Sequence, residues 1–357
     1  MTHDSRGWHR GSSCGGFVGR VARVFPVTAQ RVRWGVLGAG NIAKTFVSDL
    51  LAQGLEVAAV GSRDATKAAE FAAEFSIPAS HGSYEDLVAD PHVDVVYIAT
   101  PQTLHAEQAL LAIGAGKPVL VEKSFTSTAA EAERVVAAAR AKGVFAMEAM
   151  WTRFLPTADA IGDVLERGAI GELVSFTSSH FQNLDVSPTS RHGDPSLGGG
   201  VMADLGVYGI SMASQLLGPA TTILVDGEAS ELGVDLSASV LMRHGAGRSS
   251  ATLTRMDAPG SNRAAIVGSD GWIDIDAVFY ASTSFTVYDG GRPQRELLRF
   301  DKPQHVGRGM QFQALEVERC LHAGELESPR MPLDESVAIM AVLDEVRASI
   351  AAQAAAV

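Results

Sequence analysis

Two patterns of hydrophobic and polar positions succeed one another along the chain. Between residues 31 and 150, short apolar runs bounded by turn residues alternate with Ala-rich segments in which apolar positions recur every three to four residues. Such runs predict strands, and the periodic segments predict helices. The expected strands are 32–37, 56–61, 93–99, 118–121 and 144–147, and the expected helices are 42–52, 66–75, 104–113 and 129–141. This alternation predicts βαβ units, and therefore a doubly wound parallel sheet with helices on both faces.

The second pattern begins after residue 150. We expect a helix at 154–166, a strand at 172–180, and a helix that follows the glycine-rich stretch 197–200 and ends near Leu217. Several β-like runs then follow with no helix between them: 221–228, 236–243, 247–256, 264–267, 272–275 and 284–288. The last expected elements are two helices, 309–323 and 334–351. Strands grouped in this way predict an antiparallel or mixed sheet, so an α/β part is followed by an α+β part.

Residues 1–30 differ from both patterns. They carry Arg6, Arg10, Arg20 and Arg23, and no continuous apolar segment of the length that a secretory signal needs. We interpret them as a disordered extension or as the product of a start assigned too far upstream, with a transit-like leader as the alternative. We assign them no function.

Composition excludes several classes of function. The chain of 357 residues is 46% hydrophobic and 20% charged, which gives room for two domains with cores of ordinary size. Its net charge of −12, with no concentrated Lys/Arg stripe, argues against nucleic acids and anionic membranes as partners. No run of 18 apolar residues occurs, so no membrane span is predicted. Two cysteines, Cys14 and Cys320, are too few for a disulfide framework or a Cys-based zinc site, so we expect a cytoplasmic protein.

A glycine-rich turn lies between the first expected strand and the first expected helix. Gly38 permits a tight turn, and the missing Cβ of Gly40 lets the backbone approach a pyrophosphate. Asn41 and Ile42 open the helix, whose N-terminal N–H groups favour an anion, and the small Ala43 allows helix and strand to pack closely. Because the motif stands between a strand and a helix, we predict dinucleotide binding here and keep a purely structural turn as the alternative.

The end of the second expected strand bears on the choice of cofactor. Sites for NAD usually place a carboxylate about 20 residues after the glycines, where it binds the ribose 2′-hydroxyl. This chain has Ser62 and Arg63 there, with Lys67 one helical turn further on and Asp64 in the position of a helix N-cap. Arg63 can make a forked contact with a 2′-phosphate, so we predict NADP as the cofactor and NAD as the second possibility. The alternative for Arg63 and Lys67 is that they are ordinary solvated charges.

A third candidate segment follows the expected strand 93–99, at the edge of the sheet where ligands bind in open α/β folds. Pro101 stiffens this loop, and we expect Thr100, Pro101 and Leu104 to contact the cofactor. His105 is also a candidate for the cofactor site. It lies inside the next helix, however, so a structural role for it is at least as well supported.

Two further groups of residues bear the chemistry. Glu122 and Lys123 directly follow the apolar strand 118–121, where a solubilising lysine is hard to explain, and we expect both in the cofactor site. Asp204 and Tyr208 stand four residues apart on the helix after the glycines, and therefore on one face. If buried, both need partners, so a structural hydrogen-bonded pair is the alternative to a catalytic role.

These motifs together resemble the Gfo/Idh/MocA family of oxidoreductases. The likeness rests on short motifs at matching places along the chain: residues 38–43, Glu122-Lys123 and Asp204-x-Gly206-x-Tyr208. The branch of dimeric dihydrodiol dehydrogenase and NADP-dependent D-xylose dehydrogenase is most similar, through residues 147–154, 198–200 and 327–333. The chain departs from the family in having Ser124 where a proline usually follows the lysine.

The resemblance implies a domain order. A Rossmann domain, residues 31–150, would precede a substrate-binding and oligomerisation domain, residues 151–357, with a large open, mostly antiparallel sheet. The protein would be a homodimer or a larger homo-oligomer.

The resemblance also implies a mechanism, hydride transfer between a nicotinamide and a carbinol carbon of a sugar, polyol or vicinal diol. Tyr208 would be the general acid or base, and Asp204 would orient Lys123 or a substrate hydroxyl. Burial alone disfavours a phenolate, so the ammonium of Lys123 would have to stabilise it, besides binding the substrate hydroxyl.

Four more residues complete the expected site. Trp151 and Phe181 would form aromatic walls around the substrate, with ordinary core packing as the alternative. Arg153 would meet the phosphates of the cofactor, and Arg191 would contact the substrate or order its own loop. No His/Asp/Glu grouping has the spacing of metal ligands, and hydride transfer needs no metal, so we expect none.

Two other functions are compatible with the same fold. A non-catalytic regulator would bind the dinucleotide without turnover and hold a protein partner, and the complete set of Lys123, Asp204 and Tyr208 argues against it. A glycoside hydrolase with tightly held NAD would cleave aryl glycosides without net reduction of the cofactor, and the expected preference for NADP argues against it.

Overall fold

The first sheet is parallel and carries helices on both faces. The computed structural model describes residues 31–356, so our interpretation of residues 1–30 concerns a segment outside the described residues. The sheet has six strands in the order β3-β2-β1-β4-β5-β6. Its strands are β1 Arg33–Leu37, β2 Glu56–Gly61, β3 Ala79–His81, β4 Val95–Ile98, β5 Val119–Glu122 and β6 Ala146–Ala149. Its helices are α1 Asn41–Ala52, α2 Ala65–Phe75, α3 Tyr84–Ala89, α4 His105–Gly114 and α5 Ala129–Lys142, with the 3₁₀ turn η1 Gln102–Leu104. The doubly wound parallel sheet is confirmed.

Two elements of this sheet were not predicted. Strand β3 has 3 residues and helix α3 has 6, and neither is long enough to show a hydrophobic period. Helix α3 begins after the N-cap Ser83, whose hydroxyl accepts a hydrogen bond from the backbone N–H of Asp86 at 3.1 Å. We did not predict this cap from the sequence.

The second sheet has eight strands in the order β14-β13-β12-β11-β7-β10-β9-β8. Every neighbouring pair is antiparallel except β7 and β10, as expected of a mostly antiparallel sheet. Its strands are β7 Leu173–Phe181, β8 Ala220–Ala229, β9 Asp235–His244, β10 Ser249–Arg255, β11 Ala264–Gly268, β12 Gly271–Ile275, β13 Phe285–Asp289 and β14 Glu296–Phe300. The edge strand β14 was not predicted, because it buries little and has no clear alternation.

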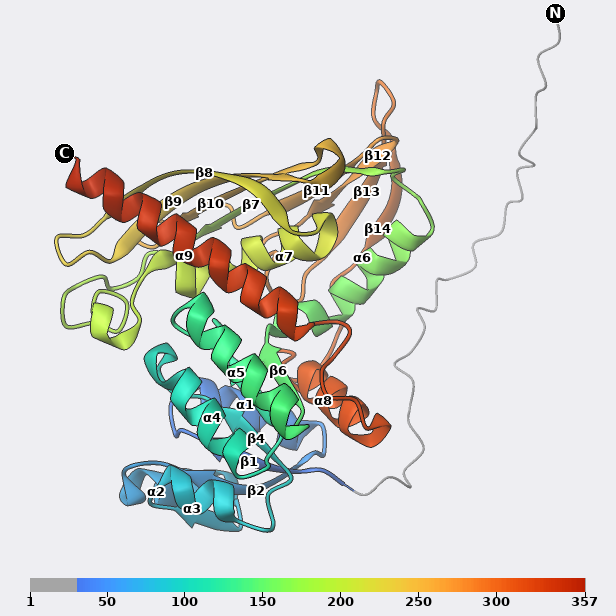
Figure 1. Ribbon diagram of the computed structural model, residues 1–357. Coiled ribbons are helices and arrows are strands. Elements are labelled where there is room, and N and C mark those ends of the chain that lie inside the picture. The colour runs from blue at the N-terminus through green and yellow to red at the C-terminus, as the bar shows by residue number, and fades with distance from the viewer. Residues whose placement is uncertain (1–30, 357) are drawn as a thin grey trace, which may run out of the picture. The chain divides into compact units, whose positions relative to one another are not determined.

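The later helices are α6 Pro156–Glu166, α7 Val207–Leu217, α8 Gln311–Ala323 and α9 Leu333–Ala355. Helices α7 and α9 pack on the second sheet, whereas α8 packs against α1 of the first. The short turns are η2 Trp151–Phe154, η3 Pro195–Leu197, η5 Gly245–Gly247 and the π-helical turn η4 Met202–Gly206. Helix α9 packs against β8 of the second sheet and against α5 of the first, so it joins the two (Figure 1). Within residues 31–356, no helix combines the length and apolar character that a membrane span requires. The division at residue 150 stays a prediction, since residues 31 onward cluster as one compact unit.

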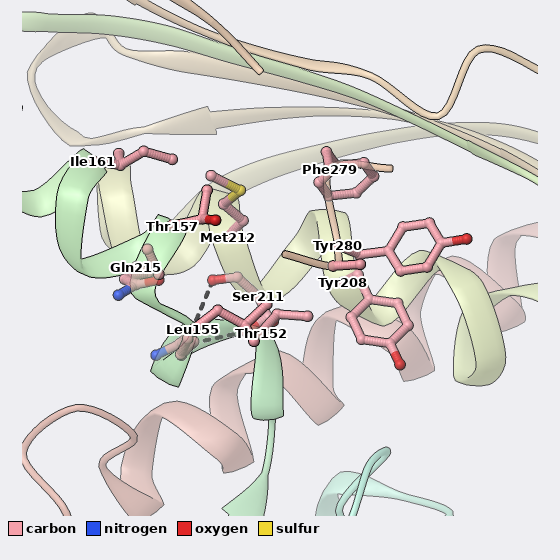
Figure 2. Close-up of a pocket in the computed structure, with 13 residues that line it drawn as sticks. Thr152, Leu155, Thr157, Ile161, Tyr208, Ser211, Met212, Gln215, Phe279 and Tyr280 are labelled. Atoms are coloured by element: carbon pink, nitrogen blue, oxygen red, sulfur yellow. Dashed lines mark hydrogen bonds between the residues drawn. The ribbon is translucent and has the colours of Figure 1, made fainter. Parts of the chain in front are cut away.

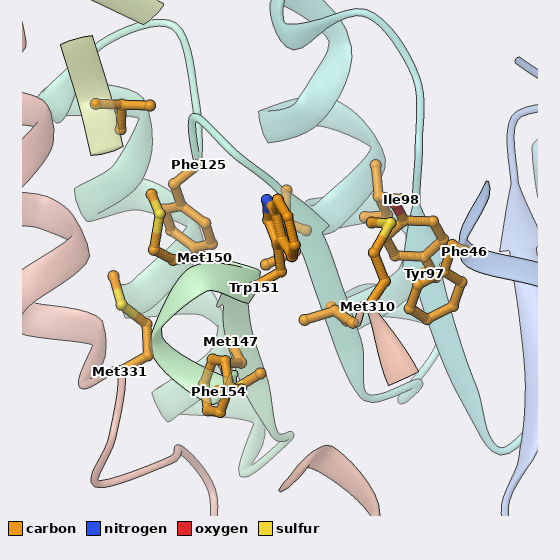
Figure 3. Packing of buried hydrophobic residues seen from close by; sticks show 14 of the residues in the cluster. Phe46, Tyr97, Ile98, Phe125, Met147, Met150, Trp151, Phe154, Met310 and Met331 are labelled. Carbon is orange, nitrogen blue, oxygen red and sulfur yellow. The ribbon is translucent and has the colours of Figure 1, made fainter. Parts of the chain in front are cut away.

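The hydrophobic core runs continuously from the parallel sheet into the C-terminal segments. Phe46 of α1 stacks on Tyr97 of β4 with ring centroids 3.8 Å apart, and Trp34 meets Phe46 edge-on at 5.4 Å. Figure 3 shows Met310, from the segment before α8, beside Tyr97 and Ile98. Segments more than 200 residues apart in sequence therefore share one core.

The outer face of the eight-stranded sheet leaves large apolar side chains exposed, namely Val174, Leu224, Leu241 and Leu253. An exposed apolar surface of this kind is typical of a protein–protein contact. The expected homo-oligomer stays a prediction.

A buried aspartate ties α1 to the segment before α8. Asp49 accepts hydrogen bonds from the backbone N–H groups of Arg308, Gly309 and Met310 at 2.9–3.1 Å. Helix α8 has no cap of its own near this end, so the carboxylate satisfies N–H groups that would otherwise lack a partner. The segment that carries Arg308 is thereby fixed on α1.

We expect the substitution Asp49→Ala to lower the free energy of unfolding by about 3 kcal/mol, because several charge-assisted hydrogen bonds and a cap disappear together. Asp49→Asn keeps one acceptor oxygen and should lose less. Urea unfolding followed by circular dichroism measures both changes. A loss below about 1 kcal/mol for the alanine variant would contradict this role of the carboxylate.

Candidate active site

The glycine turn has the shape of a phosphate cradle. Gly38 has φ +110°, and a Cβ there would lie 2.9 Å from the carbonyl oxygen of Ala99, so only glycine fits. A Cβ on Gly40 would meet no atom within 4 Å, which leaves open space at the N-terminus of α1. That helix has no side-chain cap and no acidic residue in its first turn. Its N–H groups are therefore available to an anion such as a pyrophosphate.

The tip of β2 presents unpaired cations next to this turn. Asp64 caps α2, accepting from the backbone N–H groups of Thr66 and Lys67 at 3.0 and 3.1 Å, as the sequence indicated. Ser62 accepts from the N–H of Asp64 at 3.2 Å. Arg63 and Lys67 are exposed, and within residues 31–356 no carboxylate pairs with either. Their expected contact with a cofactor phosphate stays a prediction.

The loop after β4 lies against the glycine turn, since a Cβ on Gly38 would also touch Thr100. Pro101 is exposed and Leu104 is half-buried, while the hydroxyl of Thr100 donates to Gln108. His105 is buried, and its ring nitrogens lie 3.0 Å from the carbonyl oxygens of Thr100 and of Ser124.

Burial lowers the pKa of His105, against the effect of these two contacts. The imidazole therefore holds two loops of the site together, which favours the structural role over a contact with the cofactor.

Lys123 reaches across to the second half of the chain. Its ammonium donates to the backbone oxygen and to Oδ1 of Asp204, both at 2.9 Å. An ammonium has three N–H bonds, so one is left for a substrate oxygen.

Glu122 points away from this group: it is buried and accepts from the hydroxyl of Tyr97 at 2.5 Å, and burial raises its pKa. Glu122 therefore faces the sheet interior, whereas we predicted a contact with the cofactor.

Asp204 is the centre of a charged cluster. Its Oδ1 also accepts from Arg191 at 3.0 Å, and its Oδ2 lies 3.4 Å from Nε2 of His192. Burial acts to raise the pKa of Asp204, but Lys123 and its other partners lower it well below its usual range. Burial acts to lower the pKa of Lys123, but Asp204 and Tyr208 raise it overall. Asp204 therefore holds the Lys123 ammonium through Oδ1, while Oδ2 contacts His192 at 3.4 Å, and its expected role toward Lys123 or a substrate hydroxyl stays a prediction.

A π-helical turn and a cap place Asp204 and Tyr208. The residues from Met202 to Gly206 form a π-helical turn rather than regular α-helix, a feature common at functional sites. Asp235 accepts from the backbone N–H of Met202 at 2.7 Å, and burial raises its pKa to about 6. Gly200 has φ +136°, and a Cβ there would lie 2.2 Å from Asp235, so this close approach needs glycine.

Tyr208 is buried between three groups. The ammonium of Lys123 lies 5.1 Å from its ring centroid, and the ring of Tyr280 stacks on it at 5.3 Å. The indole N–H of Trp151 donates to the Tyr208 hydroxyl at 3.2 Å. Trp151 therefore acts on the oxygen of Tyr208, where we had expected it to be an aromatic wall.

Two expected site residues have other neighbours. Arg153 is buried, and its guanidinium donates to Ser211 and in a forked contact to Glu335 at 2.7 and 2.9 Å. These partners leave it no donor for the phosphates of a cofactor. Phe181 packs on Gly260. Adjacent residues of a strand point to opposite faces of the sheet, so Phe181 and His180 lie on different faces. The inward residue is His180, whose ring lies 5.6 Å from that of Tyr208.

A small pocket lies beside Tyr208, between α6 and α7. Figure 2 shows the rings of Tyr208 and Tyr280 at its edge, with both hydroxyl groups pointing away from Met212 and Ile161. The pocket therefore adjoins the rings of Tyr208 and Tyr280, and their hydroxyl groups, where we expect proton transfer, point away from it.

Sequence reasoning missed four residues of this site: His180, His192, Asp235 and Tyr280. His192 directly follows Arg191, so the same loop could have suggested it. His180 is found by testing both phases of the alternation in β7. No local signal marks Asp235 or Tyr280, because their roles arise from contacts with distant segments.

Comparison with known proteins identifies the family. A model described as "Oxidoreductase family, NAD-binding Rossmann fold" matches residues 32–150, and one described as "GFO/IDH/MocA C-terminal domain" matches residues 159–274. The chain belongs to the Gfo/Idh/MocA family of oxidoreductases. The first part of this oxidoreductase is accordingly a Rossmann fold that binds a nicotinamide dinucleotide.

The curated relatives of this oxidoreductase include trans-1,2-dihydrobenzene-1,2-diol dehydrogenases. The mouse protein is 37% identical over 326 residues, covering 89% of this chain and 97% of that protein. The human protein is 35% identical over 336 residues with the same coverage. Among solved structures, KijD10, a 3-ketoreductase from Actinomadura kijaniata in complex with NADP and TDP-benzene, aligns with a TM-score of 0.75 at 26% identity over 89% of this chain and 98% of its own. Levoglucosan dehydrogenase in complex with NADH shares the fold, with a TM-score of 0.81 at 22% identity over 90% and 98%.

Proposed function

We propose that the protein is an NADP-dependent oxidoreductase that transfers a hydride between the nicotinamide and a carbinol carbon of a sugar, polyol or vicinal diol. One observation carries this proposal. Lys123 follows a strand of the Rossmann sheet, and its ammonium lies 2.9 Å from Asp204 and 5.1 Å from the ring of Tyr208. The three side chains of the expected acid–base set therefore meet in one place. The relatives named dihydrobenzenediol dehydrogenase and 3-ketoreductase support this substrate range.

Tyr208 exchanges the proton. In oxidation its phenolate accepts the proton of the substrate hydroxyl, and in reduction its hydroxyl donates a proton to the forming alcohol. The phenolate is stabilised by the indole N–H of Trp151 and by the nearby ammonium of Lys123. A bound nicotinamide supplies the acceptor or donor of the hydride.

Lys123 holds the reacting oxygen. Two of its N–H bonds are fixed on Asp204, so the third has a defined direction, and it donates to the substrate oxygen as charge develops there. Arg191 and His192 keep the Asp204 carboxylate in place and ionised.

The residues of the first sheet fit the dinucleotide. The open space at Gly40 and the uncapped start of α1 suit the pyrophosphate, with Thr100, Pro101 and Leu104 on the adjoining loop. Arg63 and Lys67 at the tip of β2 suit a 2′-phosphate, which NAD lacks.

The proposal is tested by supplying NADP or NAD with a panel of sugars, polyols and trans-diols and following the near-ultraviolet absorbance of the reduced nicotinamide. We expect turnover with NADP for at least one class. Binding of the dinucleotide without any turnover would contradict the proposed function.

We expect Arg63→Ala to lower kcat/KM for NADP by roughly 10- to 100-fold, because a charge-assisted forked contact is lost, and to change kcat/KM for NAD by less than about 3-fold. The exposed Arg134 of α5 gives a matched control, and Arg134→Ala should change neither value. An equal loss with both cofactors, or no loss, would show that Arg63 does not read the 2′-phosphate.

A further inference from the structure

The directions of the hydrogen bonds around Tyr280 leave its hydroxyl proton without an acceptor among residues 31–356. Nδ1 of His180 lies 3.0 Å from the carbonyl oxygen of Leu205, which can only accept, so Nδ1 carries the proton. Burial lowers the pKa of His180 to about 4, so at neutral pH its Nε2 is an acceptor. The amide of Gln182 donates to that Nε2 at 2.9 Å and to the hydroxyl oxygen of Tyr280 at 3.1 Å. The hydroxyl of Tyr280 therefore accepts from the protein, and its own proton has no acceptor among residues 31–356.

An arginine side chain lies beside the same part of the site. Arg308 lies with its guanidinium 5.7 Å from the ring centroid of Trp151, the residue whose N–H reaches Tyr208. Its backbone is fixed by Asp49, so the side chain starts from a rigid position. Burial raises the pKa of Tyr280, and the charge of Arg308 acts in the opposite direction. Within the described residues no carboxylate pairs with the Arg308 guanidinium.

Two donors thus face the neighbourhood of Tyr208 with no acceptor from the protein. We infer that the substrate carries an anionic group, a carboxylate or a phosphate, near its reacting carbinol, and that Arg308 and Tyr280 bind this group. The inference rests on the proposed function, because it concerns the substrate of that same site.

Charge favours this assignment over a neutral hydroxyl. A guanidinium bonds a carboxylate or phosphate about twice as strongly as it bonds a neutral oxygen. The chain as a whole carries a net charge of −12 and repels anions, so an anionic substrate needs a local cation. At the reacting centre the charge of Lys123 is already offset by Asp204, whereas that of Arg308 is not.

The test uses the full chain with saturating NADP and sugars that differ only at one carbon: D-glucose, D-glucuronate and D-glucose 6-phosphate, and D-galactose with D-galacturonate. We expect kcat/KM at least about 10-fold higher for an anionic member than for its neutral partner. Arg308→Gln should lower kcat/KM for the anionic sugars by roughly 10- to 100-fold and leave the neutral ones within about 2-fold. Tyr280→Phe should lower the same values by about 10-fold. Arg292→Gln, which removes an exposed arginine between β13 and β14, serves as the control and should change nothing.

Several outcomes would overturn the inference. One is an equal kcat/KM for neutral and anionic sugars. Another is an equal fall in kcat/KM for both kinds of sugar in Arg308→Gln. A dissociation constant for NADP that rises 10-fold or more in Arg308→Gln, with an unchanged preference among sugars, would assign the guanidinium to the phosphates of the cofactor. If none of these sugars is turned over, the proposed function is judged by the wider panel of sugars, polyols and trans-diols. Calorimetry of D-glucuronate and D-glucose with the NADP-saturated protein then decides, since equal binding or none overturns the inference.

Discussion

The substitution Tyr208→Phe is expected to lower kcat by about 10²- to 10⁴-fold, the usual range when a general acid or base is removed. The change deletes one oxygen atom and keeps the ring, which is stacked on Tyr280 and lies over the ammonium of Lys123. Binding of NADP, measured by fluorescence titration, should stay within about 2-fold, because the residues proposed for the dinucleotide lie on the first sheet. The free energy of unfolding should change by about 1 kcal/mol or less, since one hydrogen bond from Trp151 is lost.

The control for this variant is Tyr288→Phe. Tyr288 lies on β13, where its ring stacks on Trp272, and it has no contact with Lys123 or Asp204. We expect full turnover in this control. If Tyr208→Phe also kept full turnover, the proton would have to be exchanged by another group, and the proposed mechanism would be wrong.

The second large effect is expected for Lys123→Met. Loss of the ammonium removes the donor to the substrate oxygen and the cation beside Tyr208, so we expect kcat/KM to fall by about 10²- to 10³-fold or more. It also leaves Asp204 with the charge of Arg191 and the contact with His192. Breaking one side of a buried ion pair costs about 3–5 kcal/mol when no partner remains, so here we expect a smaller loss of stability, near 2 kcal/mol.

A double-mutant cycle separates the two consequences. In Lys123→Met combined with Asp204→Asn, the unpaired charge is gone, so the free energy of unfolding should return to within about 1 kcal/mol of the parent protein. Turnover should stay as low as in the single lysine variant. Recovery of turnover in the double variant would mean that Lys123 serves only to neutralise Asp204, and it would contradict a direct role in catalysis.

Much of the candidate site could be predicted because its signals are local. Gly38 is required by a backbone angle at a single residue, and Asp64 caps a helix through N–H groups two and three residues away. Lys123 is recognised by its place at the end of an apolar strand. Asp204 and Tyr208 are placed on one face by a spacing of four residues. Each of these inferences uses only a few consecutive residues, where steric limits and hydrogen-bond geometry leave few choices.

Several candidate side chains have partners in the structure that the sequence does not indicate. Arg153 pairs with Glu335, 182 residues later in the chain, and Trp151 donates to Tyr208, 57 residues later. The sequence marks both as candidates for the site but says nothing of these contacts. For the strand that carries His180 and Phe181, period-two alternation gives two faces without saying which one is covered by α7.

The sequence by itself determined most of the strands and helices, the glycine turn, the strand-end positions of Arg63 and Lys123, and the face shared by Asp204 and Tyr208. These follow from backbone sterics and from periodicity, which act over a few residues. Only the tertiary structure decided that Asp204 is held by Lys123, Arg191 and His192, that Trp151 reaches the Tyr208 oxygen, and that Asp49 fixes Arg308. Burial and hydrogen-bond partners depend on which distant segments pack together, and that is settled by the whole core at once.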